Sequence, residues 1–177
     1  MYEREIVEIY NKCGVCCYPI NTYSIMFNFG YKLIHYSDLQ YKYGDKIESL
    51  ERSIGDAITN LETKTVLYND KRDIRRIRFT LMHELGHIVL KDNKDEDGAD
   101  AFAAEILAPL AVIRHKHFKT AKEISDFFQL SMSASNISIL RSKISPADDD
   151  HIILDYFRDL QYNNVFYDNS TLFDYFA

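Results

Sequence analysis

The sequence predicts an α+β domain that is mostly helical, with a small antiparallel sheet and one buried helix at its centre. Residues 74–90 are apolar on nearly every face of a helix, which indicates burial. Residues 55–60 and 64–69 have the composition of two short strands joined by a polar turn, as in a β-hairpin. Much of the remaining chain carries apolar residues at the i, i+3, i+4 spacing of amphipathic helices.

Length, composition and charge limit the class of protein. A chain of 177 residues with 46% hydrophobic and 14% aromatic content can form one domain with a substantial core. Residues 1–5 lack the basic and apolar regions of a signal peptide, and no apolar run reaches about 18 residues, so we expect a cytoplasmic protein without membrane contact. The net charge of −6 argues against direct binding to nucleic acid.

The first part of the chain is expected to form two short helices and then a strand. Glu3–Lys12 is amphipathic, and Gly14 follows its end. A second helix is predicted to begin at Pro19 and to end before Gly30. Residues 31–36 are predicted to form a strand, and residues 37–45 a loop or one helical turn. The pattern of residues 46–54 is ambiguous.

The predicted hairpin comes directly before the central helix. Asp70 can cap that helix, with Asp73 completing a start that resembles a capping box. A sheet beside the helix can hold an extended peptide by strand addition. A sheet that only covers the helix fits the same pattern.

The central helix carries an H-E-x-x-H motif at residues 83–87. Residues i and i+4 share a helix face, so His83 and His87 can direct ring nitrogens at one metal ion. Glu84 is rotated by about 100° from His83, where it can take a proton from a zinc-bound water. The alternative is a buried helix that carries two histidines by chance. Burying such polar groups unpaired costs a few kcal/mol each, and a metal would give them a partner.

Tetrahedral zinc (Zn²⁺) in a catalytic site needs a third protein ligand, and the next predicted helix offers candidates. At about 100° per residue, Glu96 and Asp100 lie on its apolar side and Glu105 on the opposite side. Glu96 is therefore the better third ligand, and Asp100 a partner that orients a histidine. Because Glu96 follows His87 by only nine positions, Asp100 stays an alternative ligand. Both acids could instead only favour the helix N-terminus through its dipole.

Motifs between residues 75 and 109 resemble the ImmA/IrrE family of metallo-endopeptidases. The matching segments are Arg78-Phe79-Thr80, the H-E-x-x-H motif, Glu96-x-x-Ala99-Asp100-x-Phe102-Ala103-Ala104 and Pro109. The resemblance implies a zincin-like fold with a gluzincin-like zinc site. It implies that His83, His87 and Glu96 are the metal ligands and that Glu84 is the general base. Many members have a glutamate just before the alanine that Ala99 matches, whereas this chain has Gly98.

After Pro109 the sequence predicts a helix over 110–118 and then a helical hairpin over 121–144. The hairpin has the pattern of a helix-turn-helix core, in which these apolar residues are expected to face each other: Ile124, Phe127, Phe128, Leu130, Ile137 and Leu140. Few basic residues precede Arg141, so we interpret it as a packing element rather than a DNA-binding unit. The family resemblance implies the same.

Pro146 and the aspartates at 148–150 mark a boundary between a predicted metallopeptidase domain, 1–147, and a C-terminal extension, 148–177. The extension holds seven aspartates, one arginine and eight aromatic residues: Tyr156, Phe157, Tyr162, Phe166, Tyr167, Phe173, Tyr175 and Phe176. We expect a helix over about 151–160 and then a less regular segment packed on the domain, because so many aromatics favour burial. Alternatively, the acidic extension attracts a basic partner.

We therefore expect a zinc-dependent cytoplasmic endopeptidase. The resemblance implies a regulatory protein substrate, often a helix-turn-helix repressor encoded nearby, on a mobile element or in a stress circuit. The alternative is a non-catalytic zinc-site interaction module, such as a toxin–antitoxin component, although a scaffold does not need Glu84. A DNA-binding protein that uses residues 121–144 is a third hypothesis, disfavoured by charge. The sequence leaves the oligomeric state open.

Overall fold

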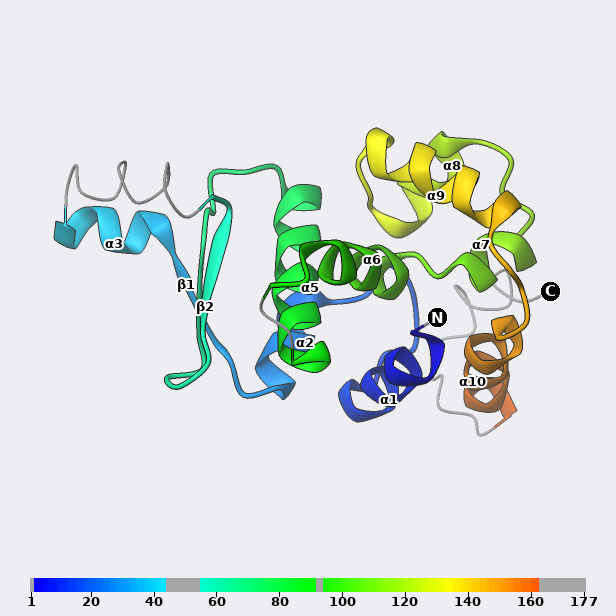
Figure 1. Ribbon diagram of the computed structural model, residues 1–177, viewed down its shortest axis with the longest axis horizontal. Coiled ribbons are helices and arrows are strands. Elements are labelled where there is room, and N and C mark those ends of the chain that lie inside the picture. The colour runs from blue at the N-terminus through cyan, green and yellow to red at the C-terminus, as the bar shows by residue number, and fades with distance from the viewer. Residues whose placement is uncertain (1, 44–54, 92–93, 163–177) are drawn as a thin grey trace. The chain divides into compact units, whose positions relative to one another are not determined.

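Helices and one small three-stranded sheet make up the structure, a computed structural model that describes residues 2–43, 55–91 and 94–162 (Figure 1). This confirms the predicted α+β class. The stretch 46–54, whose pattern was ambiguous, lies outside the described residues. Within the described ranges, none of the helices combines the length and the apolar character needed to span a membrane.

The sheet is mixed rather than purely antiparallel. The predicted hairpin is present, as β2 (Ala57–Asn60) antiparallel to β3 (Thr65–Tyr68). The third strand, β1 (Lys32–His35), pairs with β3 in parallel, which gives the order β1-β3-β2. The prediction missed this pairing because parallel strands are joined by long crossovers, which leave no local signal in the sequence. As a result β2 lies at an edge of the sheet.

The chain forms two compact units. One is Thr22–Ala103, and the other joins the residues up to Asn21 with those from Ala104 on. The predicted division into 1–147 and 148–177 stays a prediction. Five of the eight aromatic residues on which it depends lie outside the described residues: Phe166, Tyr167, Phe173, Tyr175 and Phe176.

In the unit Thr22–Ala103, helix α2 (Thr22–Asn28) packs on α5 (Ile74–Leu90), the helix that carries the H-E-x-x-H motif. Helix α2 begins three residues later than predicted. The other long helix, α6 (Glu96–Leu107), begins in this unit and ends in the other.

The two aspartates before α5 cap different helices. Asp73 is the N-cap of α5, because its side chain accepts a hydrogen bond of 2.9 Å from the Arg75 amide. Asp70, predicted to cap α5, instead accepts from the amide and hydroxyl of Ser37 at 3.0 and 2.6 Å. These bonds satisfy the start of α3 (Tyr36–Tyr43), so the described part of the predicted segment 37–45 forms a helix rather than a loop.

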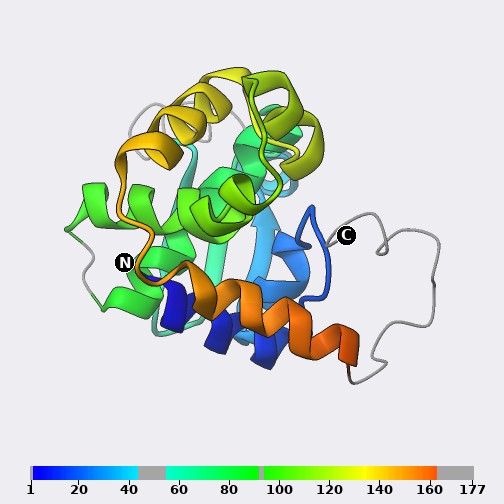
Figure 2. The ribbon, with the colours of Figure 1, turned by 90° about the vertical axis from the view of Figure 1, so that its right-hand side faces the viewer.

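In the other unit, α1 (Glu3–Cys13) and α10 (Asp150–Tyr162) lie side by side (Figure 2). The Tyr156 hydroxyl donates to the Val15 carbonyl at 2.5 Å, and the Tyr10 hydroxyl to the Ile106 carbonyl at 2.6 Å. Tyr156 and Phe157 are buried, so the helical start of the predicted extension is part of a core.

The predicted helical hairpin is present as α8 (Ala121–Phe128) and α9 (Met132–Ile144), after a short α7 (Leu110–His115). Its predicted core is only half right. Ile124 and Phe128 are buried, but Ile137 and Leu140 are each 59% exposed. Helix α9 instead buries two serines; one of them, Ser135, donates its hydroxyl to a carbonyl of the preceding turn at 2.9 Å. Small hydroxyl side chains that are satisfied locally can occupy the packed face, which turns the apolar side outward.

Candidate metal centre

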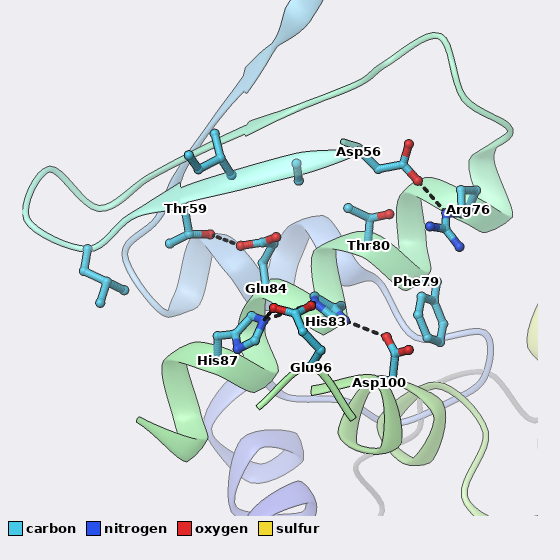
Figure 3. A pocket seen from close by; sticks show the side chains of 13 residues that line it. Asp56, Thr59, Arg76, Phe79, Thr80, His83, Glu84, His87, Glu96 and Asp100 are labelled. Atoms are coloured by element: carbon cyan, nitrogen blue, oxygen red, sulfur yellow. Dashed lines mark hydrogen bonds and ion pairs between the residues drawn. The ribbon is translucent and has the colours of Figure 1, made fainter. Parts of the chain in front are cut away.

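The two histidines of the motif converge in space because they lie one helical turn apart on α5. His83 Nε2 and His87 Nε2 are 3.1 Å apart, and both side chains are mostly buried, with 17% and 13% exposed (Figure 3). Leu81, Met82 and Leu85 fill the opposite face of the same helix and are fully buried. The apolar residues therefore fix the orientation of α5, and this orientation directs both rings to one point.

Glu96, in the first turn of α6, completes a cluster of three possible metal ligands. Its Oε2 lies 3.2 Å from His83 Nε2, and its Oε1 lies 3.5 Å from His87 Nε2. In tetrahedral zinc coordination with bonds of about 2.0–2.1 Å, neighbouring ligand atoms are ~3.3 Å apart. Each histidine nitrogen therefore lies at about this spacing from the other histidine and from one oxygen of the Glu96 carboxylate. Two imidazoles with one carboxylate are a donor set that suits zinc.

Asp100 contacts the other nitrogen of His83. The distance from His83 Nδ1 to Asp100 Oδ1 is 2.7 Å, so the Nδ1–H donates to the carboxylate. This hydrogen bond selects the tautomer in which His83 Nε2 keeps its lone pair toward His87 and Glu96. The described geometry thus gives Asp100 an orienting contact, while Glu96 makes the contacts expected of a ligand.

The helix-face argument used to rank the acids was wrong about burial. Glu96 and Asp100 are 71% and 60% exposed, because they stand at the rim of an open pocket. Glu105, predicted to face away, is 5% exposed and accepts a hydrogen bond of 2.9 Å from the Leu110 amide. Burial raises the pKa of Glu105 above its usual value, against the opposing effect of that hydrogen bond. Helix periodicity thus correctly placed Glu96 and Glu105 on different faces of α6. It did not show which face the neighbouring elements cover.

A close contact between α5 and α6 brings Glu96 within reach. Gly86 and Ala99 are both buried, and a Cβ on Gly86 would lie 3.0 Å from Ala99 Cα. Helix α6 begins with a hydrogen bond of 2.8 Å from the Gly98 amide to Asp95 Oδ1. A Cβ at Gly98 would overlap the other oxygen of that carboxylate. Gly98, which stands where many members of the family have a glutamate, therefore leaves room for the Asp95 cap.

Glu84 points toward the sheet rather than toward the three clustered side chains (Figure 3). The Thr59 hydroxyl on β2 donates to Glu84 Oε2 at 2.6 Å. Sequence reasoning missed this contact. The only signal was the alternation in β2, which places Ala57 and Thr59 on the same, less exposed face of the strand.

These residues line one pocket within the unit Thr22–Ala103. The wall formed by β2 and its ends contributes Asp56, Ala57, Ile58, Thr59 and Leu61. The wall formed by the helices contributes Arg76, Phe79, Thr80, His83, Glu84 and His87 from α5, and Glu96 and Asp100 from α6. An edge strand therefore lies across an open pocket from the possible metal ligands.

One end of the pocket holds an ion-pair cluster. Arg76 Nε donates to Asp56 Oδ2 at 2.6 Å, and Arg72 Nε donates to Asp56 Oδ1 at 2.8 Å. Partial burial alone would raise the pKa of Asp56, but the hydrogen bonds and charges of the two arginines hold it below its usual value. Asp56 is therefore an anion that holds two cations at the mouth of the pocket.

Comparison with known proteins adds one finding. The family model Peptidase_M78, described as the IrrE N-terminal-like domain, matches residues 33–139. The match extends from β1 into α9 and includes every residue that lines the pocket. No curated protein matches the chain.

Proposed function

The chain belongs to the IrrE N-terminal-like family of metallopeptidases, and we propose that it is a zinc-dependent endopeptidase. The proposed ligands are His83, His87 and Glu96. The observation that supports them is that the two histidine Nε2 atoms lie 3.1 Å apart and that each lies within 3.5 Å of a Glu96 carboxylate oxygen. When bound there, zinc supplies a Lewis acid for the peptide carbonyl and acidifies the attacking water.

Glu84 is the proposed general base. It takes the proton from the attacking water and passes it to the amine of the leaving peptide. The hydrogen bond from Thr59 to Oε2 fixes the carboxylate and leaves Oε1 for the proton transfer. Asp100 keeps the His83 ring in the tautomer that a ligand needs. An oriented base argues against the non-catalytic alternative, because a scaffold does not need one.

The proposed substrate is an extended protein segment. Strand β2 lies at the sheet edge and lines the pocket, so a peptide can pair with its backbone by strand addition. Such a peptide passes in front of the clustered ligands. Following the family resemblance, we propose a cytoplasmic helix-turn-helix repressor, encoded nearby or on the same mobile element, as the natural target.

The test is to incubate the zinc-loaded protein with the repressor encoded next to its gene and to map the products by mass spectrometry. We expect one or a few defined cleavages. The Glu84→Gln variant should retain zinc and lose cleavage, and the His83→Ala/His87→Ala variant should lose both. Stoichiometric zinc in the double variant would rule out the proposed ligands.

A further inference from the structure

The pocket is charged unevenly: Arg76 supplies a cation at one end, and carboxylates surround the proposed metal site. Arg76 is the only lysine or arginine among the described residues that line the pocket. The carboxylates of Glu84, Glu96 and Asp100 line the part of the pocket around the histidines. In Figure 3 the side chain of Arg76 lies beside Asp56, away from the histidines. A peptide in this pocket therefore meets a cation at one end and the proposed metal site further along.

The cationic end has an excess of positive charge. Asp56 is the shared partner of Arg76 and Arg72, and it uses one oxygen for each. One carboxylate cannot neutralise two guanidinium groups, so the cluster keeps a net charge of about +1. The shared aspartate also fixes the position of Arg76, which reduces the entropy lost when the arginine binds a further group.

One edge of the Arg76 guanidinium remains available. The bond to Asp56 uses Nε, and the structure gives the terminal nitrogens no acceptor within the described part of the chain. The side chain is 59% exposed, so a ligand can reach it. The edge formed by the two terminal nitrogens matches a carboxylate, which accepts two parallel hydrogen bonds from it. We propose that Arg76 selects substrates that carry an aspartate or glutamate at this end of the pocket.

The position of that residue in the substrate follows from helix and strand geometry. Arg76 precedes His83 by seven positions on α5, which corresponds to ~10 Å along the helix axis. An extended peptide advances about 3.3 Å per residue. The acidic side chain therefore lies about three residues from the cleaved bond, on one side of it only. This inference rests on the proposed peptidase function and adds the class of peptide that the site prefers.

The experiment uses the zinc-loaded protein and a library of peptides made by digesting a bacterial proteome, with new cleavage sites mapped by mass spectrometry. We expect aspartate and glutamate to be enriched about three positions from the cleaved bond, on a single side. Arg76→Gln should reduce this enrichment about fivefold, the upper range for a charge pair that is largely exposed.

Arg72→Gln is the matched control. Arg72 shares the partner Asp56 and is 55% exposed, against 59% for Arg76, but it does not line the pocket. The control removes the same charge and the same kind of ion pair but keeps the guanidinium that lines the pocket. Any enrichment that comes only from the net charge of the cluster should fall in both variants, whereas the part that depends on Arg76 should be lost only in Arg76→Gln. The proposal is overturned if wild type shows no enrichment, if Arg76→Gln leaves the enrichment unchanged, or if Arg72→Gln removes it equally.

A second measurement separates this proposal from the proposed function. If the wild-type protein cleaves no peptide, the peptidase assignment fails, and binding then decides the role of Arg76. Random short peptides displayed on phage are selected on Glu84→Gln and on Glu84→Gln/Arg76→Gln. Acidic peptides enriched only on the first protein support a carboxylate site at Arg76, and no such enrichment overturns it.

Discussion

Replacing Asp100 with alanine should weaken zinc binding about tenfold without removing the metal. The carboxylate makes one contact with the site, the 2.7 Å hydrogen bond from His83 Nδ1. Loss of such an orienting partner typically costs 10- to 100-fold in metal affinity, or ~1.4–2.7 kcal/mol. Asp100 is 60% exposed, so water can replace part of the lost contact, and the lower end of that range applies.

The assay is a competition titration of zinc between each variant and a chelator of known affinity. Asp97→Ala is the control, because Asp97 lies in the first turn of the same helix, is exposed and does not line the pocket. It removes the same charge near the helix N-terminus, so it reproduces any effect of the helix dipole or of the overall field. We expect Asp97→Ala to change zinc affinity by less than about twofold, since exposed charges at a distance are screened.

Two results would refute the reasoning. Equal losses in Asp100→Ala and Asp97→Ala would show that the carboxylates act only through the helix N-terminus. Complete loss of zinc in Asp100→Ala, together with retention in Glu96→Ala, would make Asp100 the third ligand. Asp100→Asn refines the test: an asparagine oxygen can still accept from Nδ1, so it should lose less affinity than alanine.

Four further predictions concern other parts of the chain. Glu84→Gln should bind zinc like wild type but lose peptide cleavage, since an amide cannot accept the proton; undiminished turnover would exclude this role. Gly86→Ala should lower the thermal midpoint and the zinc affinity, because its Cβ would meet the backbone of α6 at 3.0 Å. Such overpacking costs about 1–3 kcal/mol, of which the higher helix propensity of alanine offsets about 1 kcal/mol. Because the pKa of Glu105 is raised in the folded protein, its contribution to the free energy of unfolding declines as pH rises above its unfolded-state pKa of about 4.3. Glu105→Gln should therefore flatten this decline in denaturant titrations at several pH values. Truncation after Ala147 removes α10 and its buried aromatics and should destabilise or aggregate the protein in a thermal scan; a stable product with normal cleavage would contradict a structural role.

Features that depend on local spacing were predicted from the sequence. The H-E-x-x-H spacing places His83 and His87 on one face of any α-helix, and the apolar residues around them require that helix to be buried. The turn between β2 and β3 and the glycine that ends α1 are equally local. These patterns involve a few neighbouring residues, so backbone geometry alone determines them.

Features that depend on neighbours from distant parts of the sequence were decided only by the tertiary structure. Periodicity assigned Glu96 and Glu105 to opposite faces of α6, but which face is covered depends on the elements around it. The hydrogen bond from Thr59 to Glu84 joins a strand to a helix 25 positions away, and no sequence spacing predicts it. The same is true of the parallel pairing of β1 and of the ion pair between Arg76 and Asp56. The sequence by itself therefore determined which helix carries the chemistry, whereas packing decided which side chains orient it, because contacts between distant segments leave no periodic pattern along the chain.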